Sequence, residues 1–286
     1  MVLATDIVFR PMLHTDIDVG LQLCRLAGWD QTRRDWERFV AADHGTAHVA
    51  LHEGRVVGTV ATIRFGREFG WIGMVLVHPD VQGRGVGAVL LGHATAELAD
   101  LGSIRLDATP AGHGLYQKHG FIDEYPLRRV EAVSATVPAS NHSWIAPLTR
   151  EGLLDVIALD RQVFGAPRAE LLEWMYDGAP GFGFVARRDG EIAGYILGRH
   201  GHEFEHLGPI IASDANLAIE LTTTCIAGVS GRPVVIDSTS EAEAWVRFLE
   251  QTGFREQRPY IRMSRGGQAP FGLEGQQFAI LGPEFG

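Results

Sequence analysis

The chain repeats its own pattern at an offset close to half of its 286 residues. Residues 49–58 have the sequence VALHEGRVVG and residues 185–194 have VARRDGEIAG, an offset of 136 positions. Three further blocks recur at similar offsets: Pro11 with Pro147, LDAT at 106–109 with IDST at 236–239, and HGF at 119–121 with TGF at 252–254. A period of this size is that of a domain and is too long for a solenoid repeat.

Chain length supports the same division, because a single hydrophobic core stops growing at roughly 250–300 residues. We therefore expect two tandem domains of one fold. The first covers residues 1–135, a linker with the sequence TVPASNHS covers 136–143, and the second covers 144–286.

Hydrophobic periodicity predicts the same mixture of elements in each half. In the first half, Thr15 can cap a helix, and two strands follow around a Glu53-Gly54 turn. The remaining expected elements are a strand at 71–77, a helix at 85–100, a strand at 104–107, a short helix at 112–119 and a strand at 125–133. This order predicts an α+β fold in which helices flank a mixed, mostly antiparallel sheet.

Charge and composition narrow the classes of partner. With 25 basic and 35 acidic residues the net charge is −10, which argues against a nucleic-acid partner. No apolar run approaches the roughly 18 residues of a membrane span. Cys24 and Cys225 lie in apolar stretches, as buried free thiols of a reducing compartment do, and Asp6 interrupts the apolar run that a leader peptide needs. We therefore expect a cytoplasmic protein without a membrane partner.

The segment 74–91, MVLVHPDVQGRGVGAVLL, carries the strongest functional pattern. A strand leads into a loop with Gly83, Gly85 and Gly87, and the loop opens a helix. Because glycine has no side chain, the backbone N–H groups of the loop can approach an anion, and the helix N-terminus adds partial positive charge. The pattern predicts a pyrophosphate site. The alternative is a glycine-rich turn that only packs closely.

A dinucleotide is one candidate for the bound pyrophosphate. Gly83, Gly85 and Ala88 match the G-x-G-x-x-A fingerprint, and Asp107 stands 20 residues beyond Gly87, where a ribose-binding acid would lie. Against this, Pro79 separates the strand from the loop, and an antiparallel meander precedes it.

The same segment resembles the GNAT superfamily of N-acetyltransferases. The run from Gln82 to Ala88 is similar to the acetyl-CoA loop of that family, and 114–121, GLYQKHGF, resembles its second signature. The resemblance implies two tandem GNAT-like domains and acetyl-CoA as co-substrate. It places the pantetheine arm along the backbone of Val75, Leu76 and Val77. It places the pyrophosphate on a further set of residues: Gln82, Gly83, Arg84, Gly85, Val86, Gly87 and Ala88.

The resemblance also implies a direct attack by the acceptor amine on the thioester. Tyr116 matches the tyrosine that protonates the leaving thiolate, and Asp107 matches an acidic position that serves as base in some members. A core tyrosine and a turn or cap aspartate are the structural alternatives. Thr109 stands where the family usually has Asn, which is a departure from the pattern.

The second half lacks these features. Its equivalent of the glycine loop, 212–220, contains no glycine and presents Asp214 where phosphate would bind, and Leu249 replaces the tyrosine. We expect it to bind no acetyl-CoA and to serve as a wall of the acceptor pocket or as a contact in a homodimer.

Trp29 and Asp30 are candidate contacts for a cationic acceptor, although packing explains the tryptophan equally well. Residues 200–206, rich in His and Glu, fall at an expected hairpin turn, so we expect no metal. The predicted function is transfer of acetyl from acetyl-CoA to the primary amine of a small molecule or peptide. The alternatives are a non-catalytic acyl-CoA-binding regulatory module and an NAD(P)-dependent oxidoreductase.

Overall fold

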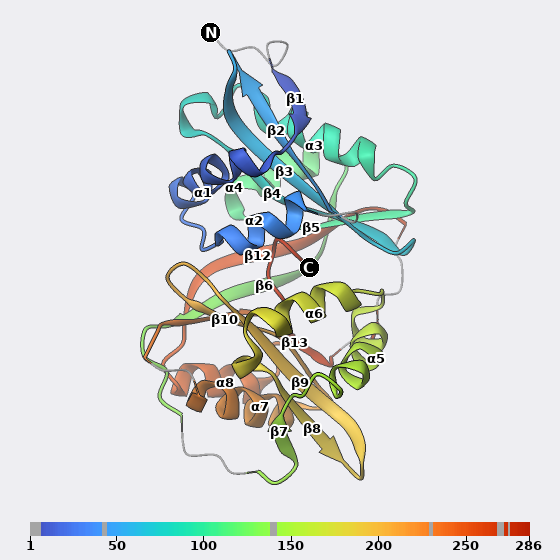
Figure 1. The fold of residues 1–286 in the computed structure, drawn as a ribbon, viewed down its shortest axis with the longest axis vertical. Helices are drawn as coiled ribbons and strands as arrows, with labels where there is room; N and C mark the ends of the chain where they lie inside the picture. The colour runs from blue at the N-terminus through green and yellow to red at the C-terminus, as the bar shows by residue number, and fades with distance from the viewer. Residues whose placement is uncertain (1–6, 42–44, 138–141, 229–230, 268–271, 274) are drawn as a thin grey trace. The chain divides into compact units, whose positions relative to one another are not determined.

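The computed structural model describes residues 7–41, 45–137, 142–228, 231–267, 272–273 and 275–286, and its fold is built from two units (Figure 1). The first unit comprises Met1–Glu124, Arg262–Ala269 and Phe285. The second comprises Tyr125–Ile261, Pro270–Glu284 and Gly286.

Four strands of the first unit form an antiparallel meander, and a fifth joins it in parallel. The strands are β1 (Val8–Pro11), β2 (Gly45–His52), β3 (Arg55–Phe65), β4 (Phe69–Val77) and β5 (Ser103–Ala108). The strand β12 (Arg255–Gly266) follows β5 in the sheet order and contributes its last residues to this unit.

Helices cover both faces of these strands. They are α1 (Ile17–Leu26), α2 (Arg33–Val40), α3 (Val86–Glu97) and α4 (Pro110–Lys118). Successive residues of β3, such as Thr59 and Val60, point to opposite faces and are both buried. The helix expected at 85–100 is observed as α3, and its apolar residues Val86, Leu90 and Ala94 are buried where it packs on β3 and β4.

The second unit repeats this order. Its strands are β7 (Ile145–Pro147), β8 (Phe184–Arg188), β9 (Glu191–His200), β10 (Glu205–Ala212) and β11 (Val234–Ser238). Its helices are α5 (Leu153–Phe164), α6 (Ala169–Gly178), α7 (Ala215–Gly228) and α8 (Glu243–Gln251). The β2–β3 hairpin corresponds to β8–β9, as the repeated sequence indicates. The expected α+β fold with a mixed, mostly antiparallel sheet is confirmed.

The two repeats exchange strands. The strand β6 (Ile122–Ala132) follows α4 in the first repeat, yet it pairs antiparallel with β11 from Ala132 with Val234 to Arg128 with Ser238. The end of β12, from the second repeat, lies in the first unit. The division between compact units therefore differs from the boundary expected at 136–143, of which 138–141 lie outside the described residues.

Two local expectations also differ. Thr15 does not cap α1; instead the carboxylate of Asp16 accepts a hydrogen bond from the backbone N–H of Leu13, 2.8 Å away. The helix α2 was not expected, although Thr32 and Asp35 at its start form a reciprocal cap that fixes its first turn. Within the parts of the chain described above, no helix is long and apolar enough to cross a membrane.

The packing of α3 on β3 makes a testable contrast between two glycines. A Cβ at Gly58 would lie 2.8 Å from the carbonyl oxygen of Leu76 and 2.9 Å from Leu90, whereas a Cβ at Gly92 in α3 meets nothing within 4 Å. We expect Gly58→Ala to destabilise the protein by about 1–3 kcal/mol and Gly92→Ala to stabilise it by about 0.5–1 kcal/mol. Thermal unfolding followed by circular dichroism measures both, and equal shifts of the two midpoints would contradict the packing described.

Candidate active site

A bulge interrupts β4 just before the glycine loop. Thr59 pairs with Leu76 and Ala61 pairs with Gly73, so Met74 and Val75 share the place of one residue. The hydroxyl of Thr59 donates a hydrogen bond to the carbonyl oxygen of Met74, 2.8 Å away. Met74 has φ +55°, a conformation that costs free energy for a residue with a side chain and that clusters at functional sites. Bulges of this kind redirect a strand next to active sites.

Beyond the bulge, β4 and β5 do not pair. Their parallel register is limited to Gly70 with Ile104 and Trp71 with Arg105, both near the start of the strands. Among the described residues, no strand pairs with the β5-facing edge of β4 between Ile72 and Val77. Backbone groups on this edge are available to an extended ligand that adds to the sheet as a strand would.

The loop after β4 is held in a defined shape. A 3-10 turn spans Pro79–Val81, and the side-chain amide of Gln82 donates a hydrogen bond to the carbonyl oxygen of Val77, 3.0 Å away. Gly83 has φ +73° and Gly85 has φ +86°, a region that glycine enters without strain. Gly85 is the N-cap residue of α3.

The N-terminus of α3 is open to an anion. No side chain caps it, and its first turn holds no acidic residue. The first N–H groups of a helix have no partner within the helix, and they carry its positive dipole end. Gln82, Gly83, Arg84 and Gly85 are exposed. The arrangement is that of a phosphate-binding helix terminus.

Gly83 and Gly87 have different roles. A Cβ at Gly83 would meet nothing within 4 Å, so only its backbone conformation demands glycine. A Cβ at Gly87 would lie 3.3 Å from the side chain of Leu115 in α4, so this glycine lets α3 and α4 approach. Val86 is buried, while Ala88 is half-buried.

Tyr116 directly follows Leu115 in α4 and is 8 % exposed. Its ring packs edge-on against Phe121 and over Gly112, where a Cβ would lie 2.8 Å from it. Burial raises the pKa of the Tyr116 phenol to about 12. The phenol is therefore neutral at physiological pH and able to donate a hydrogen bond. Thr109, which replaces the expected Asn, caps α4 by accepting a hydrogen bond from the N–H of Gly112.

Asp107, the next-to-last residue of β5, forms a buried ion pair. Its two carboxylate oxygens each accept a hydrogen bond from Arg262, with Nε and Nη2 both 2.8 Å away. The two side chains are 0 % and 2 % exposed, and the guanidinium lies 4.7 Å from the centre of the Trp71 ring. This geometry is that of a structural partner, and it leaves the role of Asp107 as a base an untested prediction.

The second unit contains the same pair. Asp237, the repeat of Asp107, accepts hydrogen bonds of 2.7 and 2.8 Å from Arg129, and both side chains are buried. Because the second repeat lacks the glycine loop and the tyrosine, its pair cannot be explained by acyl transfer. The ion pair of this aspartate is therefore a feature that both units share.

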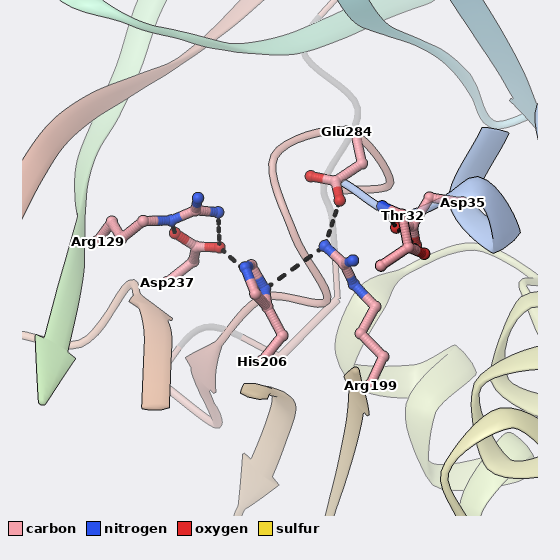
Figure 2. A network of polar contacts seen from close by, with 7 residues as sticks. All are labelled: Thr32, Asp35, Arg129, Arg199, His206, Asp237 and Glu284. Atoms are coloured by element: carbon pink, nitrogen blue, oxygen red, sulfur yellow. Dashed lines mark hydrogen bonds and ion pairs between the residues drawn. The ribbon is translucent and has the colours of Figure 1, made fainter. Parts of the chain in front are cut away.

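Figure 2 shows how this pair extends into a buried network in the second unit. His206 lies 3.9 Å from the carboxylate of Asp237 and 3.5 Å from Arg199, which pairs with Glu284. Burial, and then the positive charges of Arg199 and Arg129, hold the pKa of His206 well below its usual value. The imidazole is thus neutral in the folded protein.

The C-terminal segment fills the interval between β10 and β11. These strands pair in parallel only at Glu205 with Val234 and His206 with Val235, the register seen between β4 and β5. Beyond it, β13 (Gln277–Ala279) pairs antiparallel with β10 and meets β11 at Ser238. The place that is open beside β4 is occupied here by the chain itself.

The helix terminus of the second unit is also filled. The carboxylate of Asp214 accepts a hydrogen bond from the N–H of Leu217 at the start of α7, 3.0 Å away, and pairs with Arg188 at 2.8 Å. The hydrogen bond from Leu217 and the nearby Arg188 lower the pKa of Asp214, so the carboxylate stays ionised. Leu249, at the tyrosine position, is buried in α8.

The candidate acceptor contacts lie in the connection between α1 and α2. Trp29 is half-buried, its carbonyl accepts a hydrogen bond from Arg25, and Asp30 is buried. Asp35 accepts hydrogen bonds from the backbone and hydroxyl of Thr32, the pair drawn in Figure 2, so its carboxylate caps α2. The role of Trp29 and Asp30 as acceptor contacts stays a prediction.

Comparison with known families agrees with this geometry. Two models described as an acetyltransferase (GNAT) domain match the chain, one over residues 43–123 and one over residues 156–279. The chain belongs to the GNAT family. It carries two GNAT domains in tandem, and the expected family is confirmed.

Two relatives resemble this GNAT protein over most of their length. A holothin acyltransferase from Pseudoalteromonas sp. (strain SANK 73390) is 27 % identical over 260 residues, which are 90 % of this chain and 87 % of the relative. An uncharacterized N-acetyltransferase, YitH, from Bacillus subtilis (strain 168) is 27 % identical over 251 residues, which are 85 % and 86 % of the two chains.

Solved structures share the fold of the whole chain. A putative acetyltransferase from Pyrococcus horikoshii has a TM-score of 0.81 at 19 % identity, covering 100 % of this chain and 98 % of that one. A tandem GNAT protein from the clavulanic acid biosynthesis pathway has a TM-score of 0.65 at 15 % identity, covering 92 % and 99 %. At these identities the likeness concerns the fold alone.

The Asp107–Arg262 pair gives a test that separates a structural role from a catalytic one. Asp107→Asn leaves a buried guanidinium without its counter-charge, and we expect it to destabilise the protein by about 3–5 kcal/mol. The double variant Asp107→Asn, Arg262→Met removes both charges and should recover most of that loss. Urea unfolding measures stability, and acyl transfer is assayed on the same variants. Normal stability of Asp107→Asn combined with lost activity would instead support a base.

Proposed function

We propose that this GNAT protein transfers an acetyl group from acetyl-CoA to a primary amine of a small molecule or peptide. The observation that carries the proposal is the combination of an unpaired β4 edge and an uncapped α3 N-terminus at its end. The GNAT family and the relatives named as acyltransferases support acyl transfer in general.

The β4 edge and the α3 N-terminus would bind different parts of acetyl-CoA. The backbone of Val75, Leu76 and Val77 would pair with the amide groups of the pantetheine arm, as an added strand does. The N–H groups from Gly83 to Ala88 would hold the pyrophosphate, with the exposed side chain of Arg84 adding positive charge. These residues are the cofactor-binding set that the sequence predicts.

In the reaction, the neutral amine attacks the thioester carbon. A C–N bond forms, the C–S bond breaks, the nitrogen loses one proton, and the leaving thiolate takes one up. A backbone N–H at the bulge would stabilise negative charge on the carbonyl oxygen. The proposal needs a donor at the sulphur atom, and Tyr116 is the candidate.

The environment of Tyr116 refines that role. Proton transfer from a phenol with a pKa of about 12 to the thiolate of a thiol with a pKa of about 8.5 is thermodynamically unfavourable. Tyr116 would therefore donate a hydrogen bond that stabilises the developing thiolate, and the proton released by the amine neutralises it. Asp107 is assigned no proton transfer, because Arg262 engages both of its oxygens.

We propose that the second unit binds no acyl-CoA, since β13 lies beside β10 and Asp214 caps α7. The dinucleotide alternative finds no support in the fold, because β3 and β4 are antiparallel and no second mononucleotide half follows. The remaining alternative is a protein that binds acyl-CoA without catalysis.

Titration calorimetry with acetyl-CoA, free CoA and NAD tests the cofactor. We expect one acetyl-CoA per chain, no binding of NAD, and loss of acetyl-CoA binding in Gly85→Glu, whose carboxylate would repel the pyrophosphate. The matched control is Asp214→Asn in the second unit, which should leave affinity and stoichiometry unchanged. Two acetyl-CoA per chain would refute the proposal for the second unit, and binding of NAD alone would refute the proposal for the first.

Tyr116→Phe distinguishes catalysis from binding alone. Removal of the hydroxyl should lower kcat by roughly 10²-fold or more, the range for losing a hydrogen bond to developing negative charge, without weakening acetyl-CoA binding. The exposed Tyr125→Phe serves as the control. Release of CoA is followed with a panel of amines, and holothin is included because a relative is named for it. Unchanged turnover in Tyr116→Phe would exclude the tyrosine from the reaction.

A further inference from the structure

Three metal-ligand side chains of the first unit meet between β2 and α3. They are His48 on β2 and His93 and Glu97 on α3. One donor atom of each lies within 4.8 Å of the others, and all three residues are half-buried. His93 and Glu97 are four positions apart, so both side chains project from the same face of the helix.

Each of the two imidazoles has a buried nitrogen atom without a hydrogen-bond partner among the described residues. These atoms are Nδ1 of His48 and Nε2 of His93. Their rings meet edge to face with centroids 4.3 Å apart. Imidazole nitrogens without a hydrogen bond are available as ligands for a metal ion.

Surrounding groups hold the ligands in place. The hydroxyl of Thr62 on β3 donates a hydrogen bond to Oε2 of Glu97, 3.3 Å away. Phe9 on β1 stacks on the ring of His93 at a centroid distance of 5.4 Å and an angle of 10°. Contacts of this kind, a hydrogen bond to the carboxylate and an apolar cover over the imidazole, orient the ligands of protein metal sites.

We propose that His48, His93 and Glu97 bind a divalent transition-metal ion, with Zn²⁺ as the best match. Two imidazole nitrogens and one carboxylate oxygen form a common zinc ligand set. Two ligands at about 2.1 Å from a tetrahedral zinc are about 3.4 Å apart. Nδ1 of His48 and Oε2 of Glu97 are 3.9 Å apart, so a small side-chain shift completes the site.

The ion would fasten the C-terminal half of α3 to β2. The N-terminus of the same helix carries the proposed pyrophosphate site, two turns before His93. The site is thus a structural addition to the first unit and is separate from acyl transfer. The expectation of no metal considered only the contiguous run 200–206. There His200 pairs with Glu205, and His206 joins the buried network.

Zinc binding is tested on the full, tag-free chain after removal of metal with a chelator. Competition with a chromophoric zinc indicator should give one tight site per chain, and added Zn²⁺ should raise the midpoint of thermal unfolding. Co²⁺ in place of Zn²⁺ should give visible absorption typical of nitrogen and oxygen ligands. No saturable binding at micromolar Zn²⁺ would overturn the proposal.

Variants locate the ion. His93→Gln and Glu97→Gln should each lower zinc affinity at least tenfold and remove the thermal shift, whereas His14→Gln, at an exposed position of the same unit, should change neither. Retained affinity in His93→Gln, or loss in His200→Gln, would place the ion elsewhere and refute the site. Far-UV circular dichroism of each variant reports whether the first unit is folded, and it keeps this test independent of the proposed function.

Discussion

The buried arginine–aspartate pair at the end of β5 and of β11 is the interaction on which the rest of the architecture depends. Asp107 meets Arg262, and Asp237 meets Arg129, with both carboxylate oxygens engaged in each case. A buried charge without its partner is strongly destabilising. Each arginine comes from a strand of the other repeat. Arg262 lies on β12 of the second repeat, and Arg129 lies on β6 of the first. The exchange of β6 and β12 is therefore what satisfies the central carboxylate of each unit, and neither repeat contains its full set of partners.

Within this shared frame, the two units treat the same sheet opening and helix terminus in opposite ways. In the first, the β5-facing edge of β4 has no strand partner beyond Trp71 among the described residues, and Gly85 leaves the start of α3 uncapped. In the second, β13 supplies the missing strand, and Asp214 supplies the missing anion. A peptide strand and a carboxylate occupy the places proposed for pantetheine and phosphate. The second unit retains the fold because the chain itself satisfies these backbone groups.

The sequence predicts those features that depend on local pattern. Alternation of apolar residues and the Glu53-Gly54 turn locate β2 and β3, and helical spacing locates the stripe of α3. The paired prolines and LDAT/IDST blocks reveal the repeat. The capping pair Thr32 and Asp35 is a local signal for the start of α2, which hydrophobic periodicity alone does not reveal.

What the sequence does not show depends on contacts between distant residues. The alternation of residues in β6 indicates which side chains lie on each face of the sheet, but it does not indicate which strand β6 pairs with. The pairing of β6 with β11 therefore cannot be predicted from the sequence pattern. Arg262 lies 155 positions from Asp107, and a lone aspartate at a strand end suits a base as well as an ion pair. His48 is likewise far along the chain from His93 and Glu97, and neither spacing resembles a known metal motif. The dinucleotide fingerprint illustrates the converse, a local match that the antiparallel order of β3 and β4 does not support.

The position of β13 has a consequence for how such a protein evolves. A duplicated domain that had lost only its glycines could regain a cofactor through a few substitutions in the loop. Here the tail forms main-chain hydrogen bonds with both neighbouring strands, and Phe278 is buried among core side chains that include Trp245. Restoring the loop would leave the tail in place, and removing the tail would expose part of the core. A second repeat that binds the cofactor would require both changes at once, so single substitutions cannot convert the second repeat into a copy of the first.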